Sequence, residues 1–157
     1  MRLYLVRHGD AEPKKTDPNR PLTPAGVKES KKVADFLQPL KLSVEDIWHS
    51  GKTRAVQTAG IVAKAFVTGN APQQHDGLDP EDPVGPIARG LEARNADLVI
   101  VGHLPFLSSL ISELLIGDPE VDLVDFAKSA AVCLDHSGED DVWSLLWMVT
   151  PDLCGPI

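Results

Sequence analysis

The sequence predicts an α/β fold: a single domain of three α/β/α layers, with a largely parallel central sheet and a C-terminal antiparallel hairpin. Strand-like and helical stretches alternate over the first two thirds of the chain, which is typical of a parallel sheet covered by helices. Two more strand-like stretches follow one another near the C-terminus without a helix between them, as in a hairpin. A length of 157 residues suits one domain, so we expect a single domain over residues 1–157.

The strands are predicted from short apolar stretches that end at polar residues. Residues 97–102 hold a continuous apolar run, typical of a central strand that is buried on both faces. Trp143 and Trp147 are expected to pack on one face of the last strand. The predicted strands cover residues 2–7, 44–49, 97–102, 130–136 and 142–149.

The helices are predicted from apolar positions with helical spacing and from residues that begin or end a helix. Thr23 is a good N-cap, and Pro24 suits the first helical position. Gly117 stops the last helix, which begins near Pro105. The predicted helices cover about residues 24–38, 52–66, 84–95 and 105–116, and polar loops cover residues 10–21 and 69–86.

The charge balance excludes a protein that binds nucleic acid through a global positive field. The chain has 15 Lys and Arg against 23 Asp and Glu, a net charge of −8, so an anion must bind at a local positive cluster. No apolar run is long enough for a membrane span, and the N-terminus does not resemble a signal peptide. Two cysteines, Cys133 and Cys154, make no disulfide framework. We therefore expect a cytoplasmic protein that binds neither nucleic acid nor a membrane.

Several familiar catalytic motifs are absent. The segment from Gly51 to Thr53 resembles the end of a P-loop, but Asp46 stands where that motif needs glycine. Glu139 stands where a cysteine phosphatase built on Cys133 would need arginine. The chain has no dinucleotide-binding glycine pattern and no serine-hydrolase elbow. Its five histidines lack metal-ligand spacing, so we expect neither a metal nor another cofactor.

A positive set of side chains lies just beyond the carboxyl ends of the predicted strands. In a parallel sheet these ends meet at one edge, where ligands bind. Arginine grips two phosphate oxygens at once, and a neutral histidine can attack phosphorus through one ring nitrogen. Gly9 would let the backbone approach such a ligand without a Cβ in the way. The pattern therefore predicts a site for a phosphoryl group. The set is Arg7, His8, Arg20, Arg54 and His103.

Three short motifs resemble the signatures of the histidine phosphatase, or phosphoglycerate-mutase-like, superfamily. They occur in the family's order, each at a predicted strand end, and the likeness covers essentially the whole chain. The chain also resembles one subgroup, the short bacterial phosphohistidine phosphatases of the SixA type, in the run from Arg20 to Thr23. The motifs are Arg7-His8-Gly9, then Ser50 followed by Arg54-Ala55-Val56-Gln57-Thr58-Ala59, and Val101-Gly102-His103.

The resemblance implies a role for each residue of the set. His8 would be the nucleophile, which becomes phosphorylated and is then freed by water. Arg7, Arg54 and His103 would hold the phosphoryl oxygens, and Arg20 would add a contact to the substrate phosphate.

The resemblance leaves the general acid open. Much of the superfamily has a glutamate after a middle strand that protonates an alcohol leaving group, and residues 77–82 contain no clear match. Asp79 is the nearest candidate, and a turn residue is the other interpretation of it. A weak or absent acid suits the P–N bond of phosphohistidine, because a protonated imidazole leaves readily, whereas an alkyl phosphate needs the acid.

The expected function is therefore that of a metal-independent phosphatase acting on protein phosphohistidine, for example on a histidine phosphotransfer domain in a bacterial signalling relay. One alternative is a phosphomonoesterase of the same superfamily that acts on a small phosphorylated molecule. The other is a phospho-ligand binding module without turnover, although a binding module has no need of a nucleophile such as His8.

Overall fold

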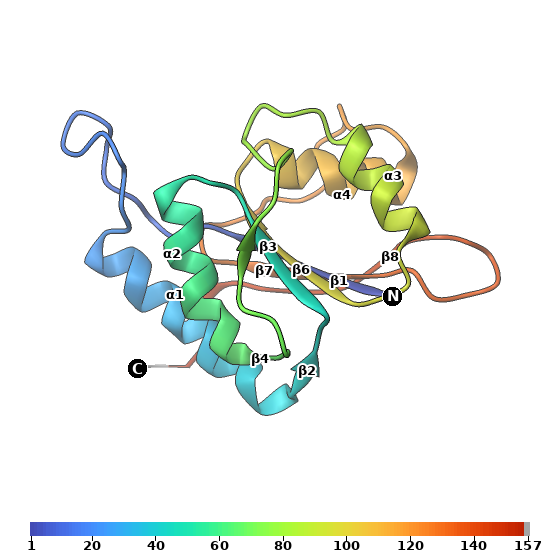
Figure 1. The fold of residues 1–157 in the computed structure, drawn as a ribbon, viewed down its shortest axis with the longest axis horizontal. Helices are drawn as coiled ribbons and strands as arrows, with labels where there is room; N and C mark the ends of the chain where they lie inside the picture. The colour runs from blue at the N-terminus through green and yellow to red at the C-terminus, as the bar shows by residue number, and fades with distance from the viewer. Residues whose placement is uncertain (156–157) are drawn as a thin grey trace.

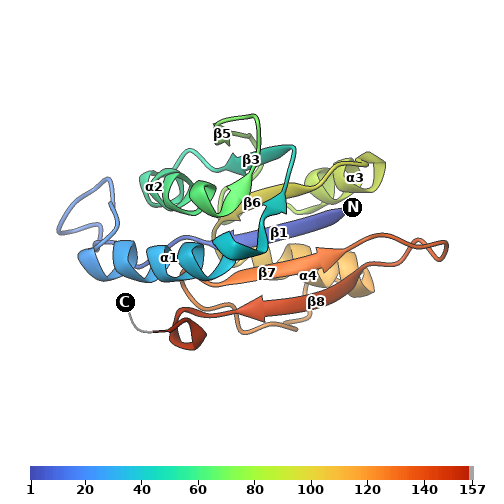
Figure 2. The ribbon, with the colours of Figure 1, turned by 90° about the horizontal axis from the view of Figure 1, so that it is seen from below.

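The computed structural model describes residues 1–155 of the chain. Its centre is one mixed sheet whose strands are β1 (Arg2–Arg7), β3 (Asp46–His49), β5 (Gln73–Gln74), β6 (Leu98–Gly102), β7 (Ala131–Asp135) and β8 (Ser144–Val149). The strand order is β5-β3-β6-β1-β7-β8, which Figure 2 shows from top to bottom. The first four strands in this order are parallel, whereas β7 is antiparallel to β1 and β8 is antiparallel to β7. The largely parallel sheet and the C-terminal hairpin are thus confirmed.

Helices cover both faces of this sheet, as predicted. They are α1 (Pro24–Leu37), α2 (Thr53–Val62), α3 (Gly85–Ala93) and α4 (Phe106–Ile116). In Figure 1 the helices α1 and α2 lie on one side of the sheet, and α3 and α4 lie on the other. Alternate residues of β1 face the two sides: Leu3 and Leu5 pack under α3 and α4, and Tyr4 and Val6 pack under α1 and α2.

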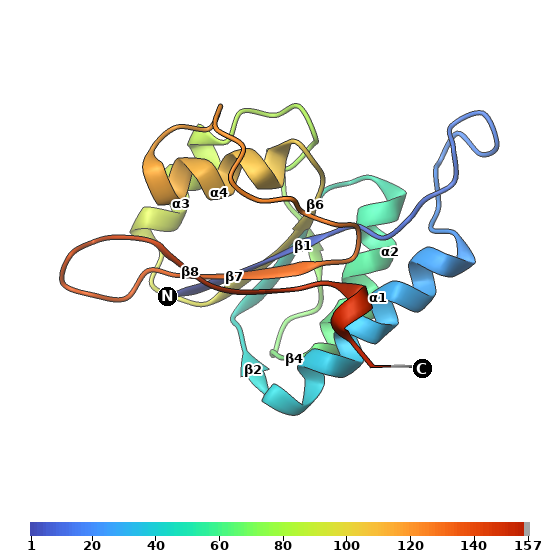
Figure 3. The same ribbon diagram turned by 180° about the vertical axis from the view of Figure 1, so that it is seen from behind.

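The register of three neighbouring strands sets the position of the site. The last residues of β1 and β6, Arg7 and Gly102, are partners in the parallel pairing, and β3 ends one position earlier along β6. The residues that follow β1 and β6 therefore leave the sheet at the same level, and the residue that follows β3 lies one position before them. These residues are His8, Ser50 and His103. The loop of residues 10–21 projects from this carboxyl edge, as Figures 1 and 3 show.

The other predicted helices and strands agree with the structure to within two residues at each end, but two regions differ more. The helix predicted over residues 52–66 ends at Val62, because the chain must become extended at Phe66, where β4 (Phe66–Val67) pairs with β2 (Leu42–Ser43). The turn Ala63–Ala65 makes the transition as a 3₁₀ helix. The predicted loop 69–86 contains β5, whose glutamines give no apolar signal for a strand. Other short 3₁₀ helices are Gln38–Leu40 and Pro151–Leu153.

Trp143 and Trp147 do not share a face, so that expectation was wrong. Trp143 packs in the cluster under α3 and α4, whereas Trp147 lies against the cluster under α1 and α2. The pairing of β7 with β8 shifts register between Cys133 and Leu134. A bulge of this kind moves later side chains to the opposite face, which a strict alternation does not anticipate.

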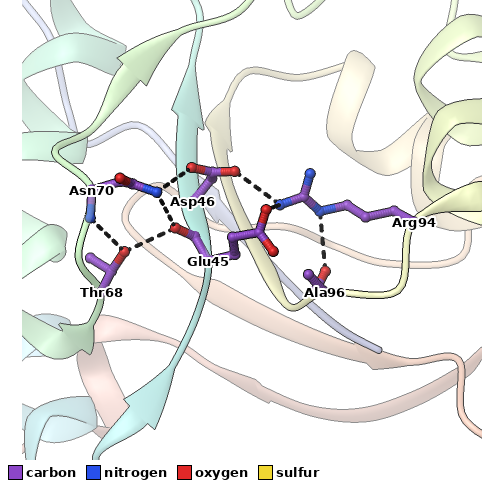
Figure 4. Close-up of polar contacts among 6 residues, drawn as sticks. All are labelled: Glu45, Asp46, Thr68, Asn70, Arg94 and Ala96. Carbon is purple, nitrogen blue, oxygen red and sulfur yellow. Dashed lines mark hydrogen bonds and ion pairs between the residues drawn. The ribbon is translucent and has the colours of Figure 1, made fainter.

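A polar cluster fixes the opposite, amino-terminal edge of the sheet (Figure 4). Arg94 forms an ion pair with Asp46 at 3.0 Å and donates a hydrogen bond to the carbonyl of Ala96 at 3.1 Å. Asn70 donates to the other carboxylate oxygen of Asp46 at 3.0 Å. Because Asp46 begins β3, these groups lie a strand's length from the carboxyl edge, and Arg94 belongs to this cluster instead of the anion site.

Two further expectations concern the chain as a whole. No helix among residues 1–155 has the length and apolar character needed to cross a membrane. Cys133 and Cys154 are free and buried. Burial raises the pKa of Cys133 to about 11, so this thiol is a packing group and not a nucleophile at neutral pH.

We expect the Gly26→Ala substitution to destabilise the fold. A Cβ at Gly26, in the first turn of α1, would lie 2.2 Å from the backbone oxygen of Asp10, so α1 would have to move away from the loop after β1. The expected loss in the free energy of unfolding is about 1–3 kcal/mol by urea denaturation.

Gly60→Ala in α2 is the matched control. No atom lies within 4 Å of the added Cβ there, and alanine favours a helix over glycine by about 0.5–1 kcal/mol. Gly60→Ala should therefore raise the free energy of unfolding. Equal effects of the two substitutions would contradict the close packing at Gly26.

Candidate active site

The carboxyl edge of the sheet brings together four of the predicted site residues. Arg7 ends β1 and His8 follows it, His103 follows β6, and Arg54 lies in the first turn of α2. The imidazole rings of His8 and His103 have their centroids 5.1 Å apart. His8 and His103 are buried, with 7% and 1% of their surface exposed. The result is a compact positive cluster between the ends of β1 and β6.

The ring of His8 is fixed in one tautomer by a backbone hydrogen bond. Its Nδ1 lies 2.7 Å from the carbonyl oxygen of Gly9, and since a carbonyl can only accept, Nδ1 carries the proton. The other nitrogen, Nε2, then holds the lone pair. Burial lowers the pKa of His8 to about 4, and the positive charges of Arg54 and Arg7 act in the same direction. The ring is therefore neutral at pH 7 and can act as a nucleophile.

His103 is neutral for the same physical reasons. Burial lowers its pKa to about 3, assisted by the neighbouring His8 and by the positive charge of Arg54. Its Nε2 shares a hydrogen bond of 2.5 Å with the hydroxyl of Ser50, which comes directly after β3. Ser50 thereby holds the plane of the ring from the neighbouring strand.

Arg7 and Arg20 are held by backbone oxygens and not by carboxylates. Arg7 donates to the carbonyl of Phe126 at 2.8 Å. Burial lowers the pKa of Arg7 and of Arg54. Among the described residues, no ion pair of 4.0 Å or less involves Arg7, Arg20 or Arg54. Unneutralised guanidinium groups this close together favour the binding of an anion.

Buried polar atoms without a hydrogen-bond partner are concentrated at the same site. Four buried side-chain nitrogens in residues 1–155 have no hydrogen-bond partner, and three of them belong to the site: Arg7 Nε, Arg54 Nε and His103 Nδ1. A buried polar group without a partner costs about 1–3 kcal/mol, and native proteins contain few of them. Their concentration here is what a pocket for a ligand rich in oxygen atoms requires.

Gly9 also has a packing role that was not predicted from the sequence. A Cβ at Gly9 would lie 2.8 Å from the carbonyl oxygen of Gly26 and 2.9 Å from the hydroxyl of Ser30, both in α1. The N–H of Gly9 donates to the hydroxyl of Thr58 at 3.0 Å. The close approach that glycine permits is thus to helix α1, and its N–H is already engaged within the protein.

Arg20 lies at the end of the projecting loop and lines a cleft beside the arginine cluster. Its positive charge contributes to the lowered pKa of His8, after burial, Arg54 and Arg7. Asp79 lines the same cleft and is exposed. The negative charge of Asp79 counteracts the burial that lowers the pKa of Arg54, and its own backbone N–H is bonded to Asp82.

Two hydroxyl groups of the site were not assigned roles from the sequence. Ser50 and Thr58 lie within the second motif, but a serine or threonine in a motif does not show which atom it contacts. Thr58 accepts from Gly9 and donates to the carbonyl of Arg54 at 2.8 Å. It therefore connects the backbone beside His8 to the helix that carries Arg54. Residues 1–155 contain no group of three or more His, Cys, Asp or Glu side chains arranged to hold a metal ion.

Comparison with known proteins identifies the family. The family described as histidine phosphatase superfamily (branch 1) matches residues 3–80. The phosphohistidine phosphatase SixA of Escherichia coli K12 is 30% identical over 156 residues, which cover 96% of this chain and 94% of SixA. The chain belongs to the histidine phosphatase superfamily. It is a phosphatase of the SixA-like group.

The chain is similar to two further proteins. A solved structure of the protein histidine phosphatase SixA complexed with tungstate has a TM-score of 0.83 and 29% identity, and the match covers 97% of this chain and 98% of that one. A protein of Picosynechococcus sp. described as uncharacterized is 40% identical over 124 residues, 74% of each chain. The superfamily fold expected from the sequence is thus confirmed over nearly the whole length of this phosphatase.

We expect the two site histidines to take up a proton only in acid. The lowered pKa values, about 4 for His8 and about 3 for His103, mean that both rings stay neutral as the pH falls through 6.5, the ordinary value. Proton NMR of the imidazole C–H resonances measures this, with His8→Ala to assign one of them. A midpoint near 6.5 for either ring would contradict the burial and the positive surroundings described here.

We also expect Thr58 to control turnover through the position of the His8 loop. Thr58→Val keeps the shape of the side chain but removes the hydroxyl that bonds Gly9, and displacement of His8 should lower kcat by about 10²-fold with a smaller change in KM. Thr58→Ser keeps the hydroxyl and should retain most of the activity. If the serine variant lost as much kcat as the valine variant, the hydrogen bond would not be the cause.

Proposed function

We propose that this phosphatase uses His8 as its nucleophile and acts on protein phosphohistidine. The observation that carries the proposal is the hydrogen bond from His8 Nδ1 to the carbonyl of Gly9, which leaves Nε2 free, unprotonated and surrounded by unpaired guanidinium groups. Arg7, Arg54 and His103 would bind the phosphoryl oxygens, and Arg20 would add a contact from the loop. Their unpartnered nitrogens and lack of ion pairs support these roles.

In the first step, the lone pair of His8 Nε2 forms a bond to phosphorus while the P–N bond of the substrate breaks. The electron pair of that bond remains on the imidazole of the substrate, which leaves as a neutral ring if its other nitrogen was protonated beforehand. The arginines stabilise the charge on the three equatorial oxygens during transfer. This step leaves a phosphohistidine on His8.

In the second step, water attacks the phosphorus and the bond to His8 Nε2 breaks. The electron pair returns to the ring, the proton of the water is released, and inorganic phosphate leaves. The bond to Gly9 retains the proton on Nδ1 throughout, so the ring returns to its starting tautomer.

A phosphohistidine substrate is supported by the chemistry of the leaving group and by the relatives. The cleft has no buried carboxylic acid among its lining residues, since its carboxyl groups, Asp76 and Asp79, are exposed. An imidazole leaving group does not need such an acid, whereas an alcohol does. The E. coli relative is named phosphohistidine phosphatase SixA, and tungstate in the solved relative is an oxyanion of the same shape as phosphate.

A second candidate is a phosphomonoesterase that acts on a small molecule. The observation in its favour is that Asp79 lines the cleft next to Arg54, where a carboxylic acid could reach the leaving oxygen. In that case Asp79→Asn would lower kcat for alkyl phosphates. With phosphohistidine as the substrate, the same substitution would have little effect.

We expect His8→Ala to abolish the covalent phosphoenzyme. Wild-type protein mixed with radiolabelled phosphohistidine protein should give an acid-labile, alkali-stable label on the phosphatase within the first turnover, and turnover should fall by at least about 10³-fold in the variant. His136→Gln is the matched control, because His136 lies at the amino-terminal edge, where it stacks on Trp143. The proposal fails if His8→Ala still forms the labelled intermediate.

A substrate panel distinguishes the two candidate functions. A histidine-phosphorylated protein, an aryl phosphate and an alkyl phosphate are compared by kcat/KM in wild type and in Asp79→Asn. The proposed function predicts the highest value for the phosphohistidine and no dependence on Asp79. An alkyl phosphate that is preferred, and whose hydrolysis needs Asp79, would favour the phosphomonoesterase instead.

A further inference from the structure

The cleft that Arg20 and Arg54 share is larger than a phosphoryl group needs. It has a volume of about 620 Å³ and runs from the start of α2 to the projecting loop on one side and to residues 74–79 on the other. Cavities of this size commonly take ligands much larger than phosphate. The cleft therefore has room for a part of the substrate beyond its phosphoryl group.

The wall of this cleft is positive in a chain that is negative overall. Lys14, Arg20, Lys52 and Arg54 line it, against two carboxylates, although the chain has a net charge of −8. The charges of Lys52 and Arg20 contribute to lowering the pKa of His103, so the positive wall is continuous with the phosphoryl site. A local positive region on a negative molecule directs acidic ligands to one place.

The loop that forms one wall is already ordered. Its ends are joined by a backbone hydrogen bond from Glu12 to Pro21 of 2.8 Å, and Arg20 N–H donates to the carbonyl of Asp17 at 3.0 Å. Arg20 has a φ of 49°, which is uncommon for a residue with a side chain, and its Nε donates to the carbonyl of Glu12 at 3.0 Å. The strained backbone and this bond fix the base of the Arg20 side chain at the cleft.

The other side of the site has the opposite charge. A second depression of about 670 Å³ lies next to Arg7, is bounded by Phe126, and is lined by three acidic residues, Glu120, Asp122 and Asp125. An acidic group of a substrate would be repelled there and attracted to the cleft. The positive cleft and the acidic depression therefore favour one orientation of an acidic substrate.

We propose that this cleft is a second anion-binding subsite, which takes the carboxylate side chains next to the phosphorylated histidine of an acidic protein. Lys14, in the projecting loop, and Lys52, at the start of α2, would contact these carboxylates, while Arg7 and Arg54 hold the phosphoryl group. A protein is favoured over a small acid because the cations come from separate segments and because the loop projects beyond the helices (Figure 1). The proposal rests on the proposed function, and it specifies that the residues beside the phosphohistidine of the substrate are negatively charged.

The test compares two synthetic peptides that contain a single histidine phosphorylated with phosphoramidate, flanked in one by Glu and in the other by Gln. At low salt the wild type should hydrolyse the Glu peptide with a kcat/KM about fivefold to tenfold higher, and salt should reduce this ratio. The double variant K14E/K52E should bring the ratio to one or below. Because the result is a ratio between two peptides, a general loss of activity cancels.

The matched control is K28E/K31E, which makes the same charge change on the solvent side of α1, away from the cleft. Lys28 and Lys31 are exposed, and neither lines the cleft. This control should keep the wild-type ratio. An equal loss of preference in both double variants would mean that only net charge matters, and it would overturn the subsite.

The remaining outcomes separate the subsite from the proposed function. Equal hydrolysis of both peptides by the wild type would overturn the subsite and leave the phosphohistidine activity standing. Turnover of an aryl phosphate but of neither peptide would overturn both. A preference for phosphoglycerate over glycerol phosphate, with none between the peptides, would assign the cleft to a small acid and would also overturn the proposal.

Discussion

The parallel register of β3, β6 and β1 is the constraint on which the site depends. Arg7 and Gly102 are paired at the ends of their strands, so the histidines that follow them leave the sheet together. A slip of one residue would turn the side chains of a strand to the opposite face and would separate the two rings. The register is held by the two apolar clusters, which require alternate residues of β1 to face opposite helix layers. The packing of the core therefore also sets the geometry of the site.

The positive cluster at the carboxyl edge of the sheet lowers the stability of the fold. Arg7 and Arg54 are partly buried without a carboxylate partner, and burial lowers the pKa of both. Two neutral histidines between them avoid further positive charge, since protonation of either ring would add to the repulsion. Under the proposed function, a bound phosphoryl group would supply the missing negative charge, and the site would be more complementary to this ligand than to water. The ionic cluster around Arg94 at the other edge shows the contrast, because its charges are neutralised within the protein.

The sequence was sufficient for the strand ends and the side chains that carry charge, but not for the contacts between them. Arg7, His8, Arg54 and His103 could be placed at one edge because parallel strands and their periodicity are local patterns. The hydrogen bonds of Thr58 and Ser50 could not be predicted, since they join residues 49 and 53 positions apart. The packing role of Gly9 depends on how near α1 comes to β1, and the side on which Trp147 packs depends on a bulge in its own strand, where Leu146 has no partner in β7. Such features arise from tertiary structure, which a single segment does not encode.

The projecting loop is anchored at both of its ends. Leu22 N–H donates to the side chain of Gln57 in α2 at 2.7 Å, and the side chain of Asp10 is bonded to Thr23 and paired with Lys128. A lid that closes over a substrate must lose conformational entropy on each turnover, whereas a loop tied down in this way loses little. A ligand can then enter and leave the cleft without an opening motion of this loop, so under the proposed function the rate at which a bulky phosphoprotein dissociates would be set by the contacts it makes and not by a gate.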